Sequence, residues 1–132
     1  MASIRKEMTL RARPEAVWDA VRDVGAIYTR LAPDFVTDTR LEGDARIVTF
    51  ANGMTAKELI VDVDDAARRL VWAVVEGRPR HHNGSMQIFG AGEGARVVWI
   101  ADVLPNEIAP AISGMMQQGM EAMKRKLDGE VA

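Results

Sequence analysis

Two adjacent histidines, His81 and His82, are the side chains best suited to chemistry in this sequence of 132 residues. Apolar and polar residues alternate over residues 80–90, which predicts a strand with His82 and Met86 on one mostly apolar face and His81 on the other. In an apolar cavity His82 could act as a general acid or base, with its pKa set by burial and by a carboxylate. The alternative is a hydrogen-bonded wall residue or a residue at the cavity rim. Unchanged ligand affinity and turnover in a His82→Ala variant would exclude the catalytic role.

Asp102 is the carboxylate that we consider as the partner of His82. It lies in a predicted strand over residues 95–104, where simple alternation places it on the face opposite Trp99. An acid–base pair with His82 therefore requires a β-bulge. A metal site is not predicted, because His81 and His82 point to opposite faces and no spaced His/Glu cluster completes a ligand set. No cofactor is predicted either.

The predicted last helix carries a second signal, for binding rather than catalysis. At about 100° per residue, methionines and a glycine share one broad face of this helix. Flexible thioether side chains suit irregular apolar ligands, and ordinary core filling produces the same pattern. Gly119 leaves room on that face for a ligand or for close packing, so we expect Gly119→Leu to abolish ligand binding and to leave the fold intact.

The predicted ligand-binding residues come from this helix, from three strands and from a short helix near the N-terminus. Trp72 and Trp99 either line a cavity or belong to the core. Tyr28 lies either at the cavity entrance or on the plain surface. The full predicted set is Tyr28, Trp72, His82, Met86, Trp99, Met116, Gly119, Met120 and Met123.

The order of the predicted elements indicates an α+β fold. A half-buried strand over residues 3–11 is followed by a helix that begins at Pro14 and by a second short helix over residues 26–31, which ends ahead of Pro33. Asn52-Gly53 suits the two positive-φ positions of a tight hairpin turn, so its flanking strands should be antiparallel neighbours. Six strands are expected after the helices, at 35–42, 45–51, 54–63, 68–76, 80–90 and 95–104, divided by turns that include Glu76-Gly77-Arg78-Pro79.

Composition limits the classes of protein and partner. The chain has 17 Lys and Arg against 19 Asp and Glu and lacks a concentrated basic run, so it does not have the charge pattern of a nucleic-acid binder. Cysteine is absent, which excludes disulfides, thiolate metal sites and a cysteine nucleophile. No apolar run approaches the roughly 18 residues of a membrane span, and no signal peptide is evident. We expect one cytoplasmic domain over residues 1–132.

Together these segments resemble the SRPBCC superfamily, which has the helix-grip fold and includes START domains, birch-pollen-allergen-like proteins and polyketide cyclase/dehydrase-like proteins. The resemblance extends from about Ile4 to Leu127. It is carried by Pro14-Glu15-Ala16-Val17-Trp18, Arg68-Arg69-Leu70-Val71-Trp72, Gly94-Ala95-Arg96-Val97-Val98-Trp99 and Leu104-Pro105. It implies a curved antiparallel seven-stranded sheet wrapped around a long C-terminal helix, with two short helices between the first two strands and an apolar cavity inside.

The resemblance implies a cavity and not a mechanism. We expect the protein to bind a small hydrophobic molecule that is polyketide-like or lipid-like, with cyclase or dehydrase activity as one alternative. A carrier without catalysis is another alternative. The third is an interaction module similar to the activators of a heat-shock chaperone's ATPase, which would expose an apolar patch on the outer face of the sheet near Val98 and Ile100. Neither the identity of the ligand nor the oligomeric state follows from these patterns.

Overall fold

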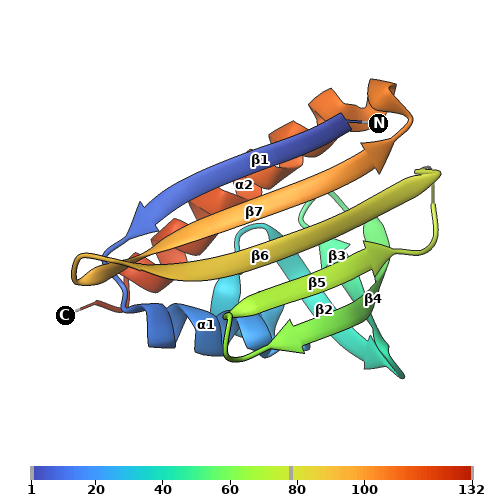
Figure 1. Ribbon diagram of the computed structural model, residues 1–132. Helices are drawn as coiled ribbons and strands as arrows, with labels where there is room; N and C mark the ends of the chain where they lie inside the picture. Colours follow the sequence, from blue (N-terminus) through green and yellow to red (C-terminus); the bar gives the residue numbers. More distant parts are fainter. Residues whose placement is uncertain (1, 78, 132) are drawn as a thin grey trace.

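A computed structural model describes residues 2–77 and 79–131 of the chain (Figure 1). The predicted Glu76-Gly77-Arg78-Pro79 turn includes Arg78, which lies outside the described residues. The elements are β1 (Ala2–Leu10), α1 (Pro14–Arg22), the π-helical turn η1 (Ile27–Leu31), β2 (Val36–Glu42), β3 (Ala45–Phe50), β4 (Thr55–Asp64), β5 (Arg69–Val74), β6 (His81–Ala91), β7 (Gly94–Leu104), the 3₁₀ turn η2 (Asn106–Ile108) and α2 (Ala109–Asp128).

All seven strands form one antiparallel sheet in the order β1-β7-β6-β5-β4-β3-β2. Every pair of neighbouring strands except β1 and β7 is also consecutive in the sequence. Short turns therefore connect most of the paired strands. The first strand returns to pair with the last one, from Ala2 opposite Val103 to Leu10 opposite Ala95. This arrangement confirms the predicted α+β sheet and its seven strands.

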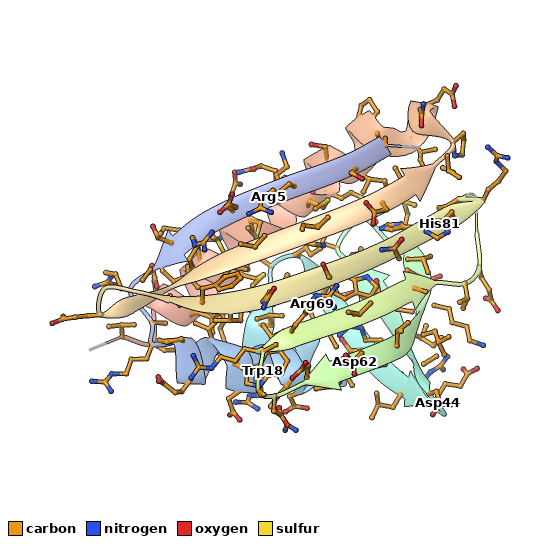
Figure 2. All side chains as sticks on the ribbon, viewed as in Figure 1. Arg5, Trp18, Asp44, Asp62, Arg69 and His81 are labelled. Carbon is orange, nitrogen blue, oxygen red and sulfur yellow. The ribbon has the colours of Figure 1, made fainter. Side chains whose placement is uncertain are left out.

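The helices lie on one face of the sheet (Figure 1). The long helix α2 runs behind β1 and β7, and α1 lies across one end of the sheet. Pro14 stands in the first turn of α1, as the sequence predicts, and the helix buries Val17, Trp18, Ala20 and Val21. The indole Nε1 of Trp18 donates a hydrogen bond of 3.0 Å to Asp65, in the loop between β4 and β5. Figure 2 shows the Trp18 side chain beside this loop. Trp18 thus belongs to the core.

The turn between β3 and β4 corrects one prediction. The two strands are antiparallel neighbours, as Asn52-Gly53 indicates, but four residues separate them and only Gly53 has a positive φ, of 88°. Asn52 Oδ1 instead accepts a hydrogen bond of 2.9 Å from the Met54 backbone N–H. The Asn52 side chain thus stabilises the loop by this hydrogen bond, and the Asn52 backbone does not need a positive φ.

The core lies between the sheet and the helices. Because side chains alternate between the two faces of a strand, every second residue of a strand enters the core. On β6, Gly84, Met86 and Ile88 are buried, while the residues between them are half-buried. Within the described residues, no helix is both long enough and apolar enough to cross a membrane.

Candidate functional site

A cavity of about 100 Å³ lies between the inner face of the sheet and α2. Twenty of the described residues line it, and only Arg46, Glu58 and His82 among them carry titratable side chains. The other lining residues are Val21, Ile27, Leu31, Ala32, Phe35, Val36, Val48, Phe50, Leu70, Trp72, Met86, Trp99, Ile112, Met115, Met116, Gly119 and Met123. The cavity is therefore an apolar space with a small number of polar groups, which is the usual composition of a small-molecule site.

Two tryptophans lie on the sheet side of the cavity. The rings of Trp72 and Trp99 lie 6.1 Å apart between centroids and are inclined by 59°. Gly84 makes room for the first of them, because a Cβ at this position would lie 2.5 Å from Cζ2 of Trp72. The structure thus places Trp72, Trp99 and Met86 in the cavity wall, where the sequence predicts them.

Helix α2 presents a stripe of small and flexible residues to the cavity. Met116, Gly119 and Met123 line it as predicted, and Met115 lines it in addition. Met120 is 3% exposed and packs in the core, but it is not among the lining residues. At about 100° per residue, Met120 lies about 40° from Met116 on the side opposite to Gly119 and Met123. It therefore points away from the cavity. A Cβ on Gly119 would lie 2.9 Å from the Trp99 ring and 3.1 Å from the Phe35 ring, so this glycine serves close packing beside the cavity.

A buried ion pair forms part of the wall. Nε of Arg46 donates a hydrogen bond of 2.8 Å to Oε1 of Glu58, and the two side chains are only 6% and 11% exposed. Nη1 of Arg46 donates to the Val24 carbonyl at 3.3 Å, and the guanidinium carbon lies 5.5 Å from the Trp72 ring centroid. The guanidinium is therefore held by a carboxylate, a carbonyl and an aromatic face at once.

His82 is the third polar residue of the wall. Burial lowers the pKa of its imidazole below the ordinary value of 6.5, the negative charge of Glu58 opposes this shift, and His81 adds to it. The imidazole is therefore largely neutral at pH 7, and one of its ring nitrogens is free of a proton. A neutral imidazole facing an apolar cavity has the protonation state that a general base requires.

The three polar residues share one row across the sheet. Arg46 lies opposite Glu58, and Glu58 lies opposite Val74. Because Ala73 lies opposite Asn83, the next position of that register brings His82 beside Val74. The polar groups are therefore at the same level along the strands, within an otherwise apolar wall.

Asp102 lies on the other face of the sheet. It accepts hydrogen bonds from Ser3 Oγ at 2.5 Å and from Asn83 Nδ2 at 3.1 Å, and these bonds hold the pKa of Asp102 below its ordinary value. His81, at the start of β6 (Figure 2), lies 2.6 Å from Asn83 Oδ1 through its Nε2. In the described parts of the chain, no three His, Asp or Glu side chains gather where they could hold a metal ion.

Three further positions differ from the sequence analysis. Tyr28 is 44% exposed and is not one of the described residues that line the cavity. Arg46 and Glu58 were not predicted as site residues, although strand alternation contains a signal for them. Arg46 has the same parity as Val48 and Phe50, and Glu58 has the same parity as Ile60, so both charges fall on the inward face of their strands.

The outer face of the sheet does not expose the residues that the interaction module would need at β7. Val98 is only 4% exposed, because Glu7 lies opposite it and bonds Arg5 and Arg96 over this region. Exposed apolar side chains occur on the outer face of β4 instead, at Leu59 and Val61.

Comparisons with known proteins agree with this architecture. The sequence matches the family described as polyketide cyclase / dehydrase and lipid transport over residues 1–128. A search of curated protein sequences found no significant match. Among solved structures, the protein XoxI from Bacillus cereus is similar with a TM-score of 0.84 and 19% identity, covering 100% of both chains.

Two other solved structures show the same fold. A protein from Thermobifida fusca has a TM-score of 0.79 and 25% identity, with 96% of this chain and 93% of that chain covered. A truncated norcoclaurine synthase from Thalictrum flavum has a TM-score of 0.70 and 17% identity, with 94% and 91% covered. Because the family match spans nearly the whole sequence and the sheet grips a long C-terminal helix, the chain belongs to the polyketide cyclase / dehydrase and lipid transport family of the SRPBCC superfamily, with its helix-grip fold.

Proposed function

We propose that the protein binds a small, mainly hydrophobic molecule in the cavity between the sheet and α2. The cavity wall carries this proposal, since 17 of its 20 described lining residues have no titratable group. Dry apolar cavities of roughly 150 Å³ in protein interiors bind benzene, so a space of this order accepts a single ring or a short alkyl chain. Met115, Met116 and Met123 are flexible enough to adjust to a larger ligand.

The polar row supports a defined orientation for the ligand. A buried ion pair adds little net stability compared with apolar residues of similar volume. We therefore assign Arg46 and Glu58 to contact with a polar group of the ligand. The apolar part of the ligand then lies against Trp99 and the methionines of α2.

Native mass spectrometry of the purified protein tests the proposal. A stoichiometric small molecule that is released on denaturation and identified as hydrophobic would support it. If the protein is isolated empty, titration with a fluorescent hydrophobic dye supplies the same test, because the dye should bind with one site per chain. Absence of both a retained molecule and saturable dye binding would contradict the proposal.

A matched pair of variants assigns the binding to the cavity. Gly119→Leu places a side chain against the Trp99 and Phe35 rings, whereas Gly114→Leu on the same helix meets open space. The first variant should lose binding and the second should retain it. Circular dichroism checks that both variants keep their secondary structure.

A second candidate function is acid–base conversion of the bound molecule, as in a cyclase or dehydrase. The position of the neutral His82 imidazole in the same wall as the Glu58 carboxylate favours it. Turnover of an identified ligand by the protein, lost in His82→Ala and retained in His81→Ala, would support catalysis. A ligand that is bound and released unchanged would support a carrier.

A further inference from the structure

The charges in the cavity wall cancel. Arg46 contributes one positive charge, Glu58 contributes one negative charge, and burial keeps His82 largely uncharged at pH 7. No other described lining residue is titratable. If the cavity is the binding site proposed above, its ligand therefore enters a wall with no net charge.

The positive charge of Arg46 is already engaged within the wall. The guanidinium bonds Glu58 and the Val24 carbonyl and lies over the Trp72 ring. A carboxylate in the ligand would have to displace Glu58 from Arg46 or accept its repulsion. An ammonium group would meet the same difficulty with the charges reversed, because Glu58 is already paired. In either case a charge would be removed from water without a free counter-ion, which is strongly unfavourable.

A neutral polar group meets no such cost. A hydroxyl can donate to the second oxygen of Glu58 or to His82, and a hydroxyl or carbonyl oxygen can accept from the guanidinium. We propose that the cavity selects neutral ligands that carry one hydroxyl or carbonyl group, and that it excludes carboxylates and ammonium ions of the same shape. The Arg46–Glu58 pair determines this specificity.

Four small aromatic probes that differ in one substituent test the selection. They are ethylbenzene, 4-ethylphenol, 4-ethylbenzoate and 4-ethylbenzylamine, and at neutral pH the last two are an anion and a cation. With wild-type protein, titration calorimetry should show the tightest binding for 4-ethylphenol, and each charged probe should bind at least about tenfold more weakly. Equal or tighter binding of 4-ethylbenzoate would overturn the proposal.

A Glu58→Gln variant reverses the expected selection. Arginine stays protonated in proteins, so this change leaves an uncompensated cation in the wall and gives the cavity a net positive charge. The affinity for 4-ethylbenzoate should then rise by about tenfold or more relative to wild type, while the affinity for ethylbenzene changes little. The anion should also raise the melting temperature of this variant more than that of wild type.

A double variant controls for folding. Arg46→Gln with Glu58→Gln restores a wall without net charge and should again disfavour 4-ethylbenzoate. If Glu58→Gln alone does not fold, refolding in the presence of 4-ethylbenzoate, and not of ethylbenzene, is the expected result. A failure to fold with either probe, or an unchanged anion affinity, would overturn the proposal.

The same titrations separate this inference from the proposed function. If none of the four probes binds wild type and the double variant is also inert, the cavity does not bind small aromatic molecules and the proposed function fails. If the probes bind but charge makes no difference, only the charge selection fails.

Discussion

At the scale of single residues, two glycines determine where the tryptophans of the cavity lie. Gly84 lies opposite Trp72 on the neighbouring strand, and the indole occupies the space that a side chain would fill. Gly119 plays the corresponding part for Trp99. The shape of the cavity thus depends on the absence of a Cβ atom at two glycines as well as on the large side chains.

A Gly84→Ala substitution should displace the Trp72 indole. The added Cβ would lie 2.5 Å from the ring, so the ring must move, and we expect a loss of about 1–3 kcal/mol in the free energy of unfolding. Denaturant titration measures the loss, and near-ultraviolet circular dichroism reports the new environment of the ring. Gly90→Ala on the same strand is the control, since nothing lies within 4 Å of its added Cβ. Equal stabilities of the two variants would contradict this account.

His82 should give the stability of the protein a pH dependence near neutrality. Because burial lowers the pKa of His82 in the folded protein below the ordinary 6.5, the unfolded chain binds more protons as the pH falls through that value. The stability contribution is therefore complete above pH 6.5 and decreases as the pH falls toward the folded-state pKa.

Thermal unfolding between about pH 7.5 and pH 5 tests this dependence. The His82→Gln variant should have a flatter profile than wild type, whereas His81→Gln removes only the smallest influence on the pKa of His82 and should retain most of the wild-type slope. Parallel profiles for wild type and His82→Gln would show that this imidazole is not buried as the structure places it. Glu7, Asp65, Asp102 and Asp128, whose pKa values are lowered, contribute only at more acidic pH.

At the scale of elements, strand alternation predicted more than any motif did. The parity of β6 correctly placed His82 with Met86 on the inner face, and the parity of β7 placed Asp102 on the outer one. The same rule applied to β3 and β4 points Arg46 and Glu58 inward. They were not predicted because charged residues are seldom buried, and only the register that sets them opposite each other shows that they are paired.

The helix stripe was predicted less well than the strands. An apolar helical face is broad, so the sequence could not separate Met120, which packs in the core, from Met115, which lines the cavity. Contacts between elements decide which methionine faces the cavity. At Asn52-Gly53 the sequence permits two local turns, the tight hairpin turn and the side-chain bond from Asn52 to the Met54 backbone, and the structure has the second.

Hydrogen bonds of Asp128 link the end of α2 to the segment after β1. Its carboxylate accepts hydrogen bonds from the backbone N–H groups of Arg11 and Ala12 and from Lys124. Burial raises the pKa of Asp128, but these bonds outweigh it and hold the pKa below its ordinary value. The carboxylate thus joins two elements that are more than a hundred residues apart in the chain.

An Asp128→Ala variant should lose about 1–3 kcal/mol of unfolding free energy, since two backbone N–H groups lose their acceptor. Denaturant titration measures this loss. Asp34→Ala is the control, because its ion pair with Arg125 joins two exposed side chains and contributes at most about 1 kcal/mol. A larger effect at Asp34 than at Asp128 would contradict this linking role.

At the scale of the whole molecule, the two faces of the sheet have different characters. The inner face holds the cavity, and the outer face carries ion pairs on β1 and β7 and exposed apolar side chains on β4. Ligand binding and any contact through the outer face are therefore separable by mutation.

A Val61→Lys variant tests that separation. Val61 is 58% exposed at a bulge of β4, so the charge reaches solvent and the cavity stays as it is. Affinity for the cavity ligand should equal that of wild type in a calorimetric titration. A loss of affinity with unchanged secondary structure would favour a site on the outer face over the cavity.

The pairing of β1 with β7 also limits when the sheet can close during synthesis on the ribosome. Strand β1 emerges before the other strands of the sheet, but its partner β7 begins only at Gly94, after five other strands have been synthesised. Until then Met8 and Leu10 lack the neighbour that covers them, and contacts at such long sequence separation form slowly. The sheet therefore cannot close strand by strand during translation, and a nascent chain that stops before β7 should remain sensitive to protease.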